Sequence, residues 1–321
     1  MILVTGGGGF FGLNAARGLV EKGQEVLLVQ RRSVQPPSYL APFWGTNVKE
    51  ARGSVMSLPF LISVAREYPI DGIVHAAVDL TGMDSSGTVA ASSGRTLNDV
   101  VQDAIQGASN ILELARLFNV KRVSFMSSVD TYRGFPKDCA EWMEDAFLPP
   151  VSFNIIGNTK KAVEQLCFLY VKSYGLSIIS LRMGRCYGPS ASHAMEPILQ
   201  MVEGAVARKP IDLSKVPINS TGHTIYVKDA AEATALLQVK EKLGHYVYNV
   251  TDGGDPTMGE AAGIVKELIP GAQITLGPAV EGKYMPTPAS NARLIEETRF
   301  APRNLREGLR AYIDFVRGGT Y

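Results

Sequence analysis

The amino-acid sequence predicts an α/β protein built on a parallel sheet that is wound on both faces by helices. Apolar stretches typical of buried strands alternate with helical stretches from residue 1 to about residue 182, and this alternation favours a doubly wound parallel sheet. A glycine-rich turn joins the first strand to the first helix. With 321 residues, 45 % of them hydrophobic, the chain has enough apolar material for one large domain or two intimate lobes.

Composition and charge exclude several classes of partner. The formal net charge of +1 gives no reason to expect nucleic acid or an anionic membrane surface. No apolar run approaches the length of a membrane span, so we expect a small-molecule partner. The three scattered cysteines indicate a reducing compartment. Because the first strand begins at the first residue, we expect no signal peptide and a cytoplasmic protein.

The first predicted strand, 2–4, is followed by the spacing Gly6-x-x-Gly9-x-x-Gly12 and then by a helix. Gly6 allows the tight turn, Gly9 lets backbone approach a pyrophosphate, and Gly12 lets the helix pack close to the strand. The phosphates would lie at the helix N-terminus, beside Phe10 and Phe11. The first gap is one residue longer than in the usual fingerprint. The alternative is a glycine-rich surface turn, but such a turn needs neither the strand nor the helix. The motif therefore predicts a Rossmann-type dinucleotide site.

The second strand, 25–30, indicates which dinucleotide binds. An acid at its end would hydrogen-bond the adenosine ribose and favour NAD. This chain has Gln30 followed by Arg31 and Arg32, and guanidinium groups bind a phosphate bidentately. We therefore expect NADP(H), with NAD(H) as the alternative. The two arginines would otherwise be solvated surface residues.

The following elements bring further residues to the same edge of the sheet. A weak third strand over 47–55 ends at Ser54 and Val55, and a helix is expected over 58–68. The next strand, 71–75, runs into Ala76 and Ala77, whose small side chains leave room for a cofactor. His75 is expected to be a packed strand-end histidine. Residues 79–95, rich in Ser, Gly and Thr, predict a mobile loop.

The second half of the predicted sheet carries the candidate chemistry. After a helix near 101–115, a strand over 121–127 ends in Ser127 and Ser128, and the ends of parallel strands are where ligands bind. The loop 133–152 contains acids at 141–145 that we expect to be solvated. A helix over 157–174 carries Lys160 near its start, and a sixth strand follows over 177–182.

After Pro189 the pattern becomes less regular. Helices are expected near 194–207, 228–240, 257–268 and 304–317, and short strands near 224–227, 246–250 and 273–276. We predict a Rossmann domain over 1–182, to which segments near 215–255 return. Residues 183–321 should mainly form a smaller substrate-binding lobe.

At this point the chain resembles the extended short-chain dehydrogenase/reductases, the group of nucleotide-sugar epimerases, dehydratases and hydroxysteroid-type dehydrogenases. The resemblance covers almost the whole length. It rests on Thr5-Gly6-x-x-Gly9-x-x-Gly12, His75-Ala76-Ala77, Ser127-Ser128-Val129-Asp130-Thr131-Tyr132-Arg133-Gly134, Gly157-Asn158-Thr159-Lys160 with Glu164, Tyr187-Gly188-Pro189, Ile225-Tyr226-Val227-Lys228-Asp229, Tyr248-Asn249-Val250 and Arg306-Glu307-Gly308-Leu309.

The resemblance implies a set of catalytic roles with one member missing. It implies that Ser128 polarises the substrate oxygen, that Lys160 holds the nicotinamide ribose, and that Met183 lies by the nicotinamide. A tyrosine four residues before the lysine should transfer the proton, but that position is Ile156. The candidates for a relocated donor are Tyr132, Asp130 and Asn154, with Tyr132 expected to be mainly structural.

Three functions remain open. The first is an NADPH-dependent ketone or aldehyde reductase, with a relocated or substrate-supplied proton, acting on an apolar or aromatic substrate because Ile156 would face the nicotinamide. The second is a non-catalytic NADP(H)-binding sensor or partner protein. The third is a nucleotide-sugar epimerase or dehydratase. The substrate contacts implied by the resemblance are Val78, Ser128, Arg185 and His223, of which Arg185 replaces a usual asparagine and His223 a usual arginine. The resemblance also implies a homodimer that pairs the helices 98–118 and 157–174. No metal ligands are expected.

Overall fold

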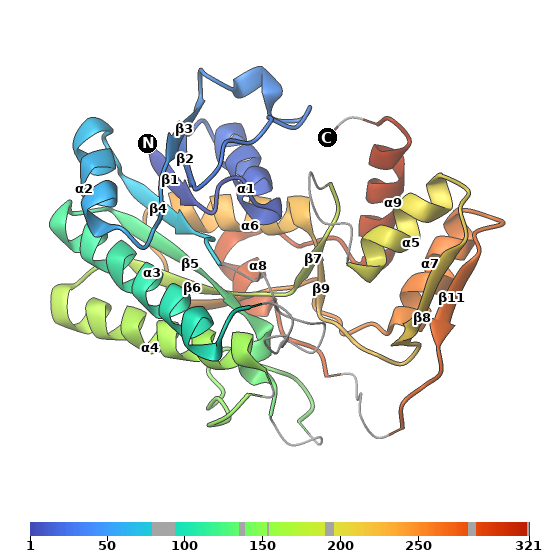
Figure 1. Cartoon of the computed structure of the whole chain (residues 1–321). Coiled ribbons are helices and arrows are strands. Elements are labelled where there is room, and N and C mark those ends of the chain that lie inside the picture. Colours follow the sequence, from blue (N-terminus) through green and yellow to red (C-terminus); the bar gives the residue numbers. More distant parts are fainter. Residues whose placement is uncertain (79–93, 135–138, 153, 190–195, 282–286, 320) are drawn as a thin grey trace. The chain divides into compact units, whose positions relative to one another are not determined.

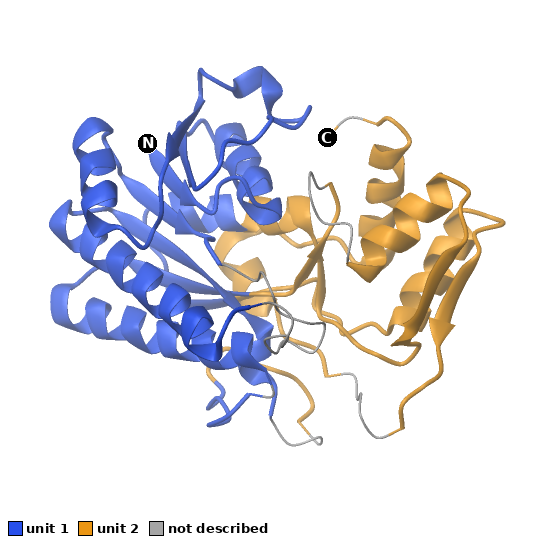
Figure 2. Ribbon diagram, in the orientation of Figure 1, with its two compact units in different colours: residues 1–135, 146–182, 234–248 blue, residues 136–145, 183–233, 249–321 orange. Residues whose placement is uncertain are grey.

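The computed structural model describes residues 1–78, 94–134, 139–152, 154–189, 196–281, 287–319 and 321. These residues form two compact units (Figure 2). Unit 1 contains residues 1–135, 146–182 and 234–248, and unit 2 contains residues 136–145, 183–233 and 249–321. The expected mobile loop at 79–95 falls almost entirely outside the described residues.

A seven-stranded sheet forms the frame of unit 1, and the boundary between the two units falls within its last strand, β10, after Tyr248. Its order is β10-β6-β5-β4-β1-β2-β3, and pairing is parallel from β3 through β2, β1 and β4 to β5. The strands are β1 (Ile2–Thr5), β2 (Val26–Gln30), β3 (Val48–Arg52), β4 (Gly72–His75), β5 (Arg122–Ser128), β6 (Ile178–Met183) and β10 (Val247–Val250). The predicted doubly wound parallel sheet is confirmed. The chain reverses its direction of winding between β1 and β4, and ligands bind at such a switch point.

Helices cover the sheet of unit 1 on both faces (Figure 1). They are α1 (Phe10–Glu21), α2 (Leu58–Glu67), α3 (Leu97–Leu117), α4 (Ile155–Tyr174) and the second half of α6 (Val227–Val239), with short 3₁₀ turns η1 (Ala41–Phe43) and η3 (Val129–Tyr132). The helices α2, α3 and α4 share one apolar core with the sheet, which includes Leu3, Leu61, Ile111, Phe125 and Val163. The side chains of a strand alternate between the two faces of the sheet. The helix α1 and the second half of α6 cover the face opposite to α2, α3 and α4.

Arg122, the first residue of β5, ties the returning segment of unit 1 to the sheet. Its buried guanidinium donates to the carbonyl oxygens of Leu237, at 3.0 Å, and of Glu241, at 3.2 Å, and also to that of Lys240. These carbonyls lie at and just beyond the C-terminus of α6, where backbone acceptors lack partners within the helix. The guanidinium therefore donates hydrogen bonds to the backbone acceptors at the end of α6, and its positive charge offsets the helix dipole.

Unit 2 has its own apolar core, to which α5, α7 and α9 contribute Met201, Val265 and Leu309. Its elements are β7 (Arg185–Tyr187), α5 (Pro197–Val206), β8 (Ile211–Pro217), β9 (Thr224–Tyr226), the first half of α6, α7 (Met258–Leu268), β11 (Ile274–Gly277), α8 (Ala292–Thr298) and α9 (Leu305–Val316). Two short parallel pairs, β7 with β9 and β8 with β11, complete it.

The structure corrects some of the sequence-based expectations. The strands β7 and β8 and the helix α8 were not predicted, and α4 begins at Ile155 rather than at residue 157. The acids of the 133–152 loop are not all solvated, because Glu144 is buried. Its Oε1 accepts from the backbone N–H of Asn249 at 2.9 Å. Within the described residues, no helix is long and apolar enough to cross a membrane.

Candidate active site

The glycine loop lies at the switch point and is closely packed. Gly6 has φ +65°, which a side chain would strain. A Cβ on Gly6 would lie 2.8 Å from Ala77 Cα, and one on Gly12 would lie 2.3 Å from the Gly6 carbonyl oxygen. The exits of β1 and β4 are therefore in contact through backbone. Gly9 caps α1 without a side-chain hydrogen bond. Half-buried Phe10 and Phe11 begin this helix, and a helix N-terminus favours an anion.

Gln30, at the end of β2, has a buried polar side chain that lacks a hydrogen-bond partner among the described residues. Both amide atoms are buried and make no hydrogen bond with the described part of the chain. The Oε1 atom would lie 2.3 Å from a Cβ on Gly8, so the amide lies directly under the glycine loop. Leaving buried polar atoms unpaired costs about 1–3 kcal/mol each. The cradle and the unpaired amide together fit a bound dinucleotide whose ribose hydroxyls would pair with this amide.

The other residues predicted for the adenosine end lie around Gln30. Arg31 and Arg32 are exposed just after β2. Ser54 and Val55 are half-buried after β3. The Val55 carbonyl oxygen accepts from Asn110 Nδ2 at 2.8 Å, which fixes this exit against α3.

At the exit of β4, His75 is a packed residue, as predicted. It is buried, and its Nδ1 lies 2.8 Å from Thr5 Oγ1. Burial and the nearby charge of Lys160 lower the pKa of His75 to about 3, so the imidazole is neutral. The backbone then passes through half-buried Ala76 and Ala77 to exposed Val78.

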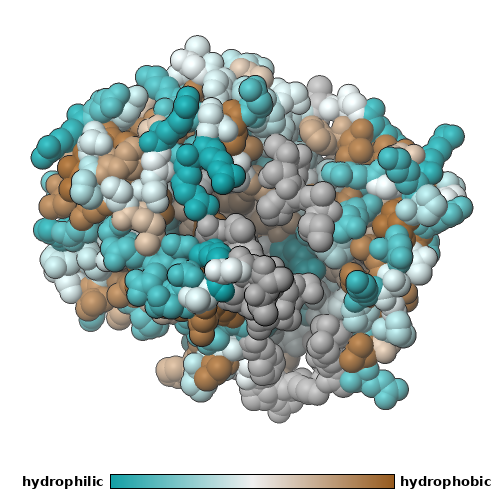
Figure 3. Space-filling model, viewed as in Figure 1, coloured by the Kyte–Doolittle hydropathy of each residue, from teal (hydrophilic) through white to brown (hydrophobic). Residues whose placement is uncertain are grey.

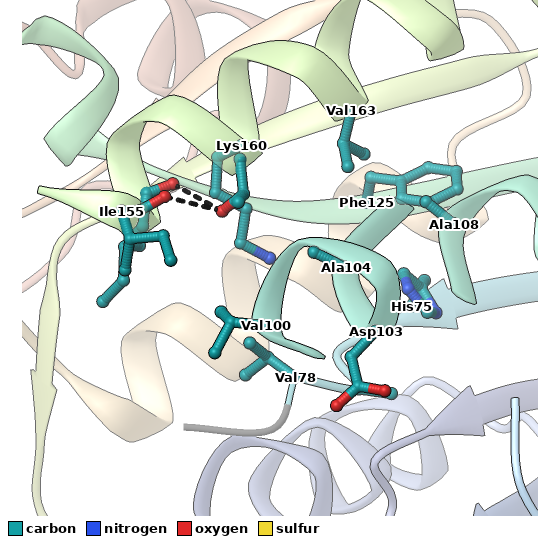
Figure 4. Close-up of a pocket in the computed structure, with 13 residues that line it drawn as sticks. His75, Val78, Val100, Asp103, Ala104, Ala108, Phe125, Ile155, Lys160 and Val163 are labelled. Carbon is teal, nitrogen blue, oxygen red and sulfur yellow. Dashed lines mark hydrogen bonds between the residues drawn. The ribbon is translucent and has the colours of Figure 1, made fainter. Parts of the chain in front are cut away.

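A pocket lies between α3, α4 and the ends of β4 and β5 (Figure 4). Its wall is mainly apolar and includes Val100, Ala104, Ile155 and Ile156. The ammonium group of Lys160 points into this pocket. Among the described residues it has no hydrogen-bond or ion-pair partner. Burial lowers the pKa of Lys160 to about 8, because an apolar wall disfavours the charged form.

Ser128 and the candidate donors Asp130 and Asn154 surround the start of η3 and α4. The Ser128 Oγ accepts from the backbone N–H of Asp130 at 3.1 Å. Both carboxylate oxygens of Asp130 are engaged: Oδ1 accepts from Arg133 Nε at 2.5 Å and Oδ2 from Asn154 Nδ2 at 2.9 Å. The Asn154 Oδ1 in turn caps α4 by accepting from the backbone N–H of Gly157 at 2.8 Å. Asp130 and Asn154 thus hold the first turn of α4 against the end of β5.

Ser127 and Tyr132 belong to a buried network behind this edge. Ser127 Oγ donates to Glu164 Oε1 at 2.5 Å, and Arg182 binds both oxygens of Glu164, at 3.1 and 2.8 Å. Arg182 also donates to the Tyr132 hydroxyl at 2.7 Å, and Tyr132 is fully buried. Met183 follows at the end of β6 and is buried as well. Tyr132 is therefore mainly structural, as predicted.

In unit 2, His223 and Arg185, the two expected substrate contacts that differ from the usual residues, have different surroundings. His223 is buried, stacks on Trp142 with ring centroids 4.3 Å apart, and places Nε2 2.7 Å from the Thr287 carbonyl oxygen. Arg185 is exposed, with Nη1 3.8 Å from Glu196 Oε1. The sequence reasoning did not foresee the stacking on Trp142, since nothing in the local pattern links residues so far apart.

Several site residues were missed although a local signal was available. Thr5 ends β1, and its hydroxyl orients the His75 ring across the neighbouring strand. Ile155 and Thr159 line the pocket with Ile156. Glu164 was named only as part of the motif with Lys160; it lies four residues after the lysine, a helical spacing that places both on one face, and a polar network there could have been predicted from this spacing. Asp103 of α3 also lines the pocket, where it pairs with Arg95 at 2.5 Å.

A glycine cradle at the switch point of a parallel sheet, with an unpaired amide beneath it, defines a dinucleotide-binding α/β protein. The model of the NAD dependent epimerase/dehydratase family matches residues 2–251. The chain belongs to this family, and the resemblance to extended short-chain dehydrogenase/reductases is confirmed.

Curated and solved proteins agree with this assignment. The chain is 27 % identical over 264 residues to an Arabidopsis thaliana trifunctional UDP-glucose 4,6-dehydratase/UDP-4-keto-6-deoxy-D-glucose 3,5-epimerase/UDP-4-keto-L-rhamnose-reductase, covering 78 % of this chain but only 36 % of that protein. It is 26 % identical over 276 residues to the UDP-glucuronate 4-epimerase of Thermodesulfobacterium geofontis, covering 83 % and 80 % of the two chains. The UDP-glucose 4-epimerase of Thermus thermophilus, solved in complex with NAD, superposes with a TM-score of 0.79 at 24 % identity, covering 99 % of both chains, which shows the shared fold.

The names of these relatives bear on the three open functions. They are epimerases and dehydratases of nucleotide sugars, and the first is also a reductase of a UDP-4-keto sugar, whereas the first expectation was a reductase of an apolar or aromatic ketone or aldehyde. The third alternative therefore agrees better with the comparisons than the first.

Proposed function

We propose that this protein is a dinucleotide-dependent enzyme that acts on a nucleotide sugar. It oxidises the sugar and then either reduces it again or eliminates a group from it. The observation that carries this proposal is that the glycine loop packs on Ala77, which lines the same pocket as Lys160. A bound nicotinamide would supply the hydride acceptor and donor. The names of the relatives support the substrate class.

The residues of this chain have separate tasks in the proposed reaction. The glycine loop binds the pyrophosphate at the start of α1, and Gln30 pairs with the adenosine ribose. Ser128 donates its hydroxyl proton in a hydrogen bond to the reacting oxygen. Lys160 holds the nicotinamide ribose from the side of α4. The apolar wall around Ile156 excludes water from the reacting carbon.

The experiment is a binding and turnover series with purified protein. NADH and NADPH binding is followed by intrinsic fluorescence, and UDP-glucose and UDP-glucuronate are incubated with NAD⁺ or NADP⁺ and analysed for epimerised or dehydrated products. Dinucleotide binding with product formation supports the proposal. Binding without any product supports the sensor function, and the absence of binding would remove the cofactor assignment itself.

NADP(H) remains our proposed cofactor, although the Thermus thermophilus structure holds NAD. Gln30 places no negative charge at the end of β2, and exposed Arg31 and Arg32 follow it. A 2′-phosphate would meet cations instead of a carboxylate. Replacing Arg31 with alanine should weaken NADPH binding more than NADH binding, and equal losses would refute the phosphate contact.

A second candidate is reduction of an apolar ketone, and the observation that favours it is the apolar pocket wall. Ile156 occupies the position where a proton donor would be expected, Ile155 lines the same pocket, and an aromatic substrate could pack there. Phenolic and quinone-like ketones tested with NADPH, with consumption followed by absorbance, would separate this candidate from the nucleotide-sugar reaction.

The exposed apolar residues of α4 support the proposed homodimer. Phe168, Leu169 and Tyr174 are all exposed large hydrophobics on this helix, and α3 packs beside α4. A second copy would cover this face in a four-helix bundle. Light scattering should give a dimer mass, and replacing Phe168 with lysine should shift it toward a monomer.

A further inference from the structure

The first turns of α4 place a lysine where the usual tyrosine is absent. Residues four apart lie on the same face of a helix, and helical side chains lean toward the N-terminus. Lys160 and Ile156 therefore lie on one face of α4, and both line the same pocket, where the Lys160 ammonium points toward Ala104 of α3 (Figure 4). An isoleucine at position 156 cannot exchange a proton, so the amine is the nearest titratable group on this face.

The other titratable groups around Lys160 are already engaged. From β4, the imidazole of His75 is neutral and bound to Thr5. From α3, Asp103 is paired with Arg95. Each of these groups has a fixed partner and is poorly suited to exchanging a proton with a ligand.

On α4 itself, two titratable residues follow Lys160 on its own face. Glu164 is held by Arg182 and Ser127. Burial raises the pKa of the Cys167 thiol, which keeps it protonated. The candidate donors of the neighbouring η3 turn are similarly committed: both oxygens of Asp130 accept hydrogen bonds.

We propose that Lys160 itself is the acid/base group of the reaction, in place of a tyrosine at position 156. This rests on the proposed function, which requires a proton to leave and return at the substrate oxygen. A pKa of about 8 gives substantial populations of both amine and ammonium near neutral pH, the condition for efficient general acid–base catalysis. A positively charged oxidised nicotinamide nearby would favour the neutral amine further.

The proton and the electrons balance in both directions. During oxidation, the neutral amine of Lys160 takes the proton of the substrate hydroxyl: the O–H bond breaks and an N–H bond forms. The oxygen electron pair forms the carbonyl, and the hydride leaves the same carbon for the oxidised nicotinamide. During reduction the ammonium returns the proton to the oxygen. Ser128 would hold that oxygen from the end of β5. The η3 turn that follows Ser128 is tied to the segment before α4, because Ser152 Oγ donates to the Asp130 carbonyl oxygen at 3.0 Å.

The first experiment needs no substrate. Native protein is labelled briefly with acetic anhydride between pH 6 and 11, and lysine modification is quantified by mass spectrometry. Exposed Lys172 of the same helix is the internal reference. Lys160 should become reactive with a midpoint near pH 8, and saturating NAD⁺ should lower that midpoint and slow the labelling. A Lys160 curve that coincides with that of Lys172 would overturn the proposal.

The second experiment measures single-turnover reduction of NAD⁺ with UDP-glucose in a stopped-flow instrument. We compare Lys160→Arg, Lys160→Met and the control Lys172→Met. Arginine keeps the charge but does not deprotonate, so Lys160→Arg should retain dinucleotide binding and yet lose about 10²–10⁴-fold in rate. The wild-type rate should rise with pH to a plateau above pH 8, and this dependence should vanish in both Lys160 variants.

The two experiments separate the two proposals. A Lys160→Arg variant that keeps the wild-type rate and pH dependence shows that only the charge is needed, which overturns the acid/base role. If the wild-type protein with UDP-glucose reduces neither NAD⁺ nor NADP⁺, this counts against the proposed substrate, and the labelling curve then decides independently whether Lys160 titrates near pH 8.

Discussion

Replacing Lys160 with methionine should stabilise the protein at neutral pH. Folding moves the lysine from a pKa of 10.5 to about 8, because the pocket desolvates its ammonium. Methionine has a similar unbranched shape and removes the charge from walls formed by Val100, Ala104 and Ile155. The variant therefore removes the desolvation free energy by which the ammonium of Lys160 destabilises the native fold.

The magnitude follows from the two pKa values. Their difference, from 10.5 to about 8, at about 1.4 kcal/mol per pH unit, corresponds to about 3 kcal/mol. The side chain is only partly buried, so solvent screening reduces this value, and we expect about 1–3 kcal/mol.

The pH dependence has a defined sign. Below pH 8 the lysine is charged in both states, and the folded state carries the full cost. Between pH 8 and 10.5 the unfolded chain binds more protons, so the wild-type stability rises with pH relative to the variant. Above pH 10.5 the amine is neutral in both states and the cost is absent.

The assay is urea unfolding of the apoprotein at pH 7 and pH 10, followed by circular dichroism. Lys160→Met should exceed the wild type by about 1–3 kcal/mol at pH 7, and the difference should shrink at pH 10. The control Lys172→Met should show neither effect. Equal stabilities at pH 7, or a difference that persists unchanged at pH 10, would refute the desolvation argument.

Three further predictions concern the cradle, the network and the pocket wall. Gly12→Ala should abolish NADH binding by fluorescence, since its Cβ would lie 2.3 Å from a backbone oxygen, whereas Gly263→Ala, with open space around its Cβ, should leave binding intact. Glu164→Gln should lower the free energy of unfolding by about 3–5 kcal/mol, because it leaves buried Arg182 without its counter-charge; a loss below about 1 kcal/mol in urea unfolding would mean that the pair behaves like a surface pair. Ile156→Tyr should shift the pH midpoint of single-turnover NAD⁺ reduction by UDP-glucose, because a phenol would then share the proton with the lysine, and an unchanged profile would show that residue 156 does not face the reacting oxygen.

The sheet of unit 1 could be predicted almost completely from the sequence. Short apolar runs such as 26–29 are buried on both sides, and such runs are typical of parallel strands. In unit 2 the signals were weaker. The strand β7 has three residues and one buried side chain, Tyr187, so no period can be read from it. The strand β8 does alternate, with Ile211 and Leu213 buried, and this period could have been recognised.

The candidate site was predictable in its residue types but not in its connections. Ser128, Lys160 and the departure at Ile156 follow from spacing along the chain. The unpaired amide of Gln30 depends on how β2 packs under the glycine loop. The pKa of Lys160 depends on residues of α3 that lie far away in the sequence. Contacts between distant segments carry no local pattern, and this is why the acid/base role that we propose for the lysine is argued from the structure.

The contacts of Arg122 set an order for the assembly of unit 1 during synthesis. Its guanidinium reaches carbonyl oxygens 115 and 119 residues later in the chain, so it stays without these partners until residue 241 has left the ribosome. Loop closure over that length is slow, and residues 136–145 and 183–233 of unit 2 are synthesised before it can occur. A fragment that ends at residue 182 would contain six of the seven strands and a buried cation without its acceptors. Unit 1 is therefore completed late, and no continuous N-terminal fragment that ends before residue 234 contains all of its segments.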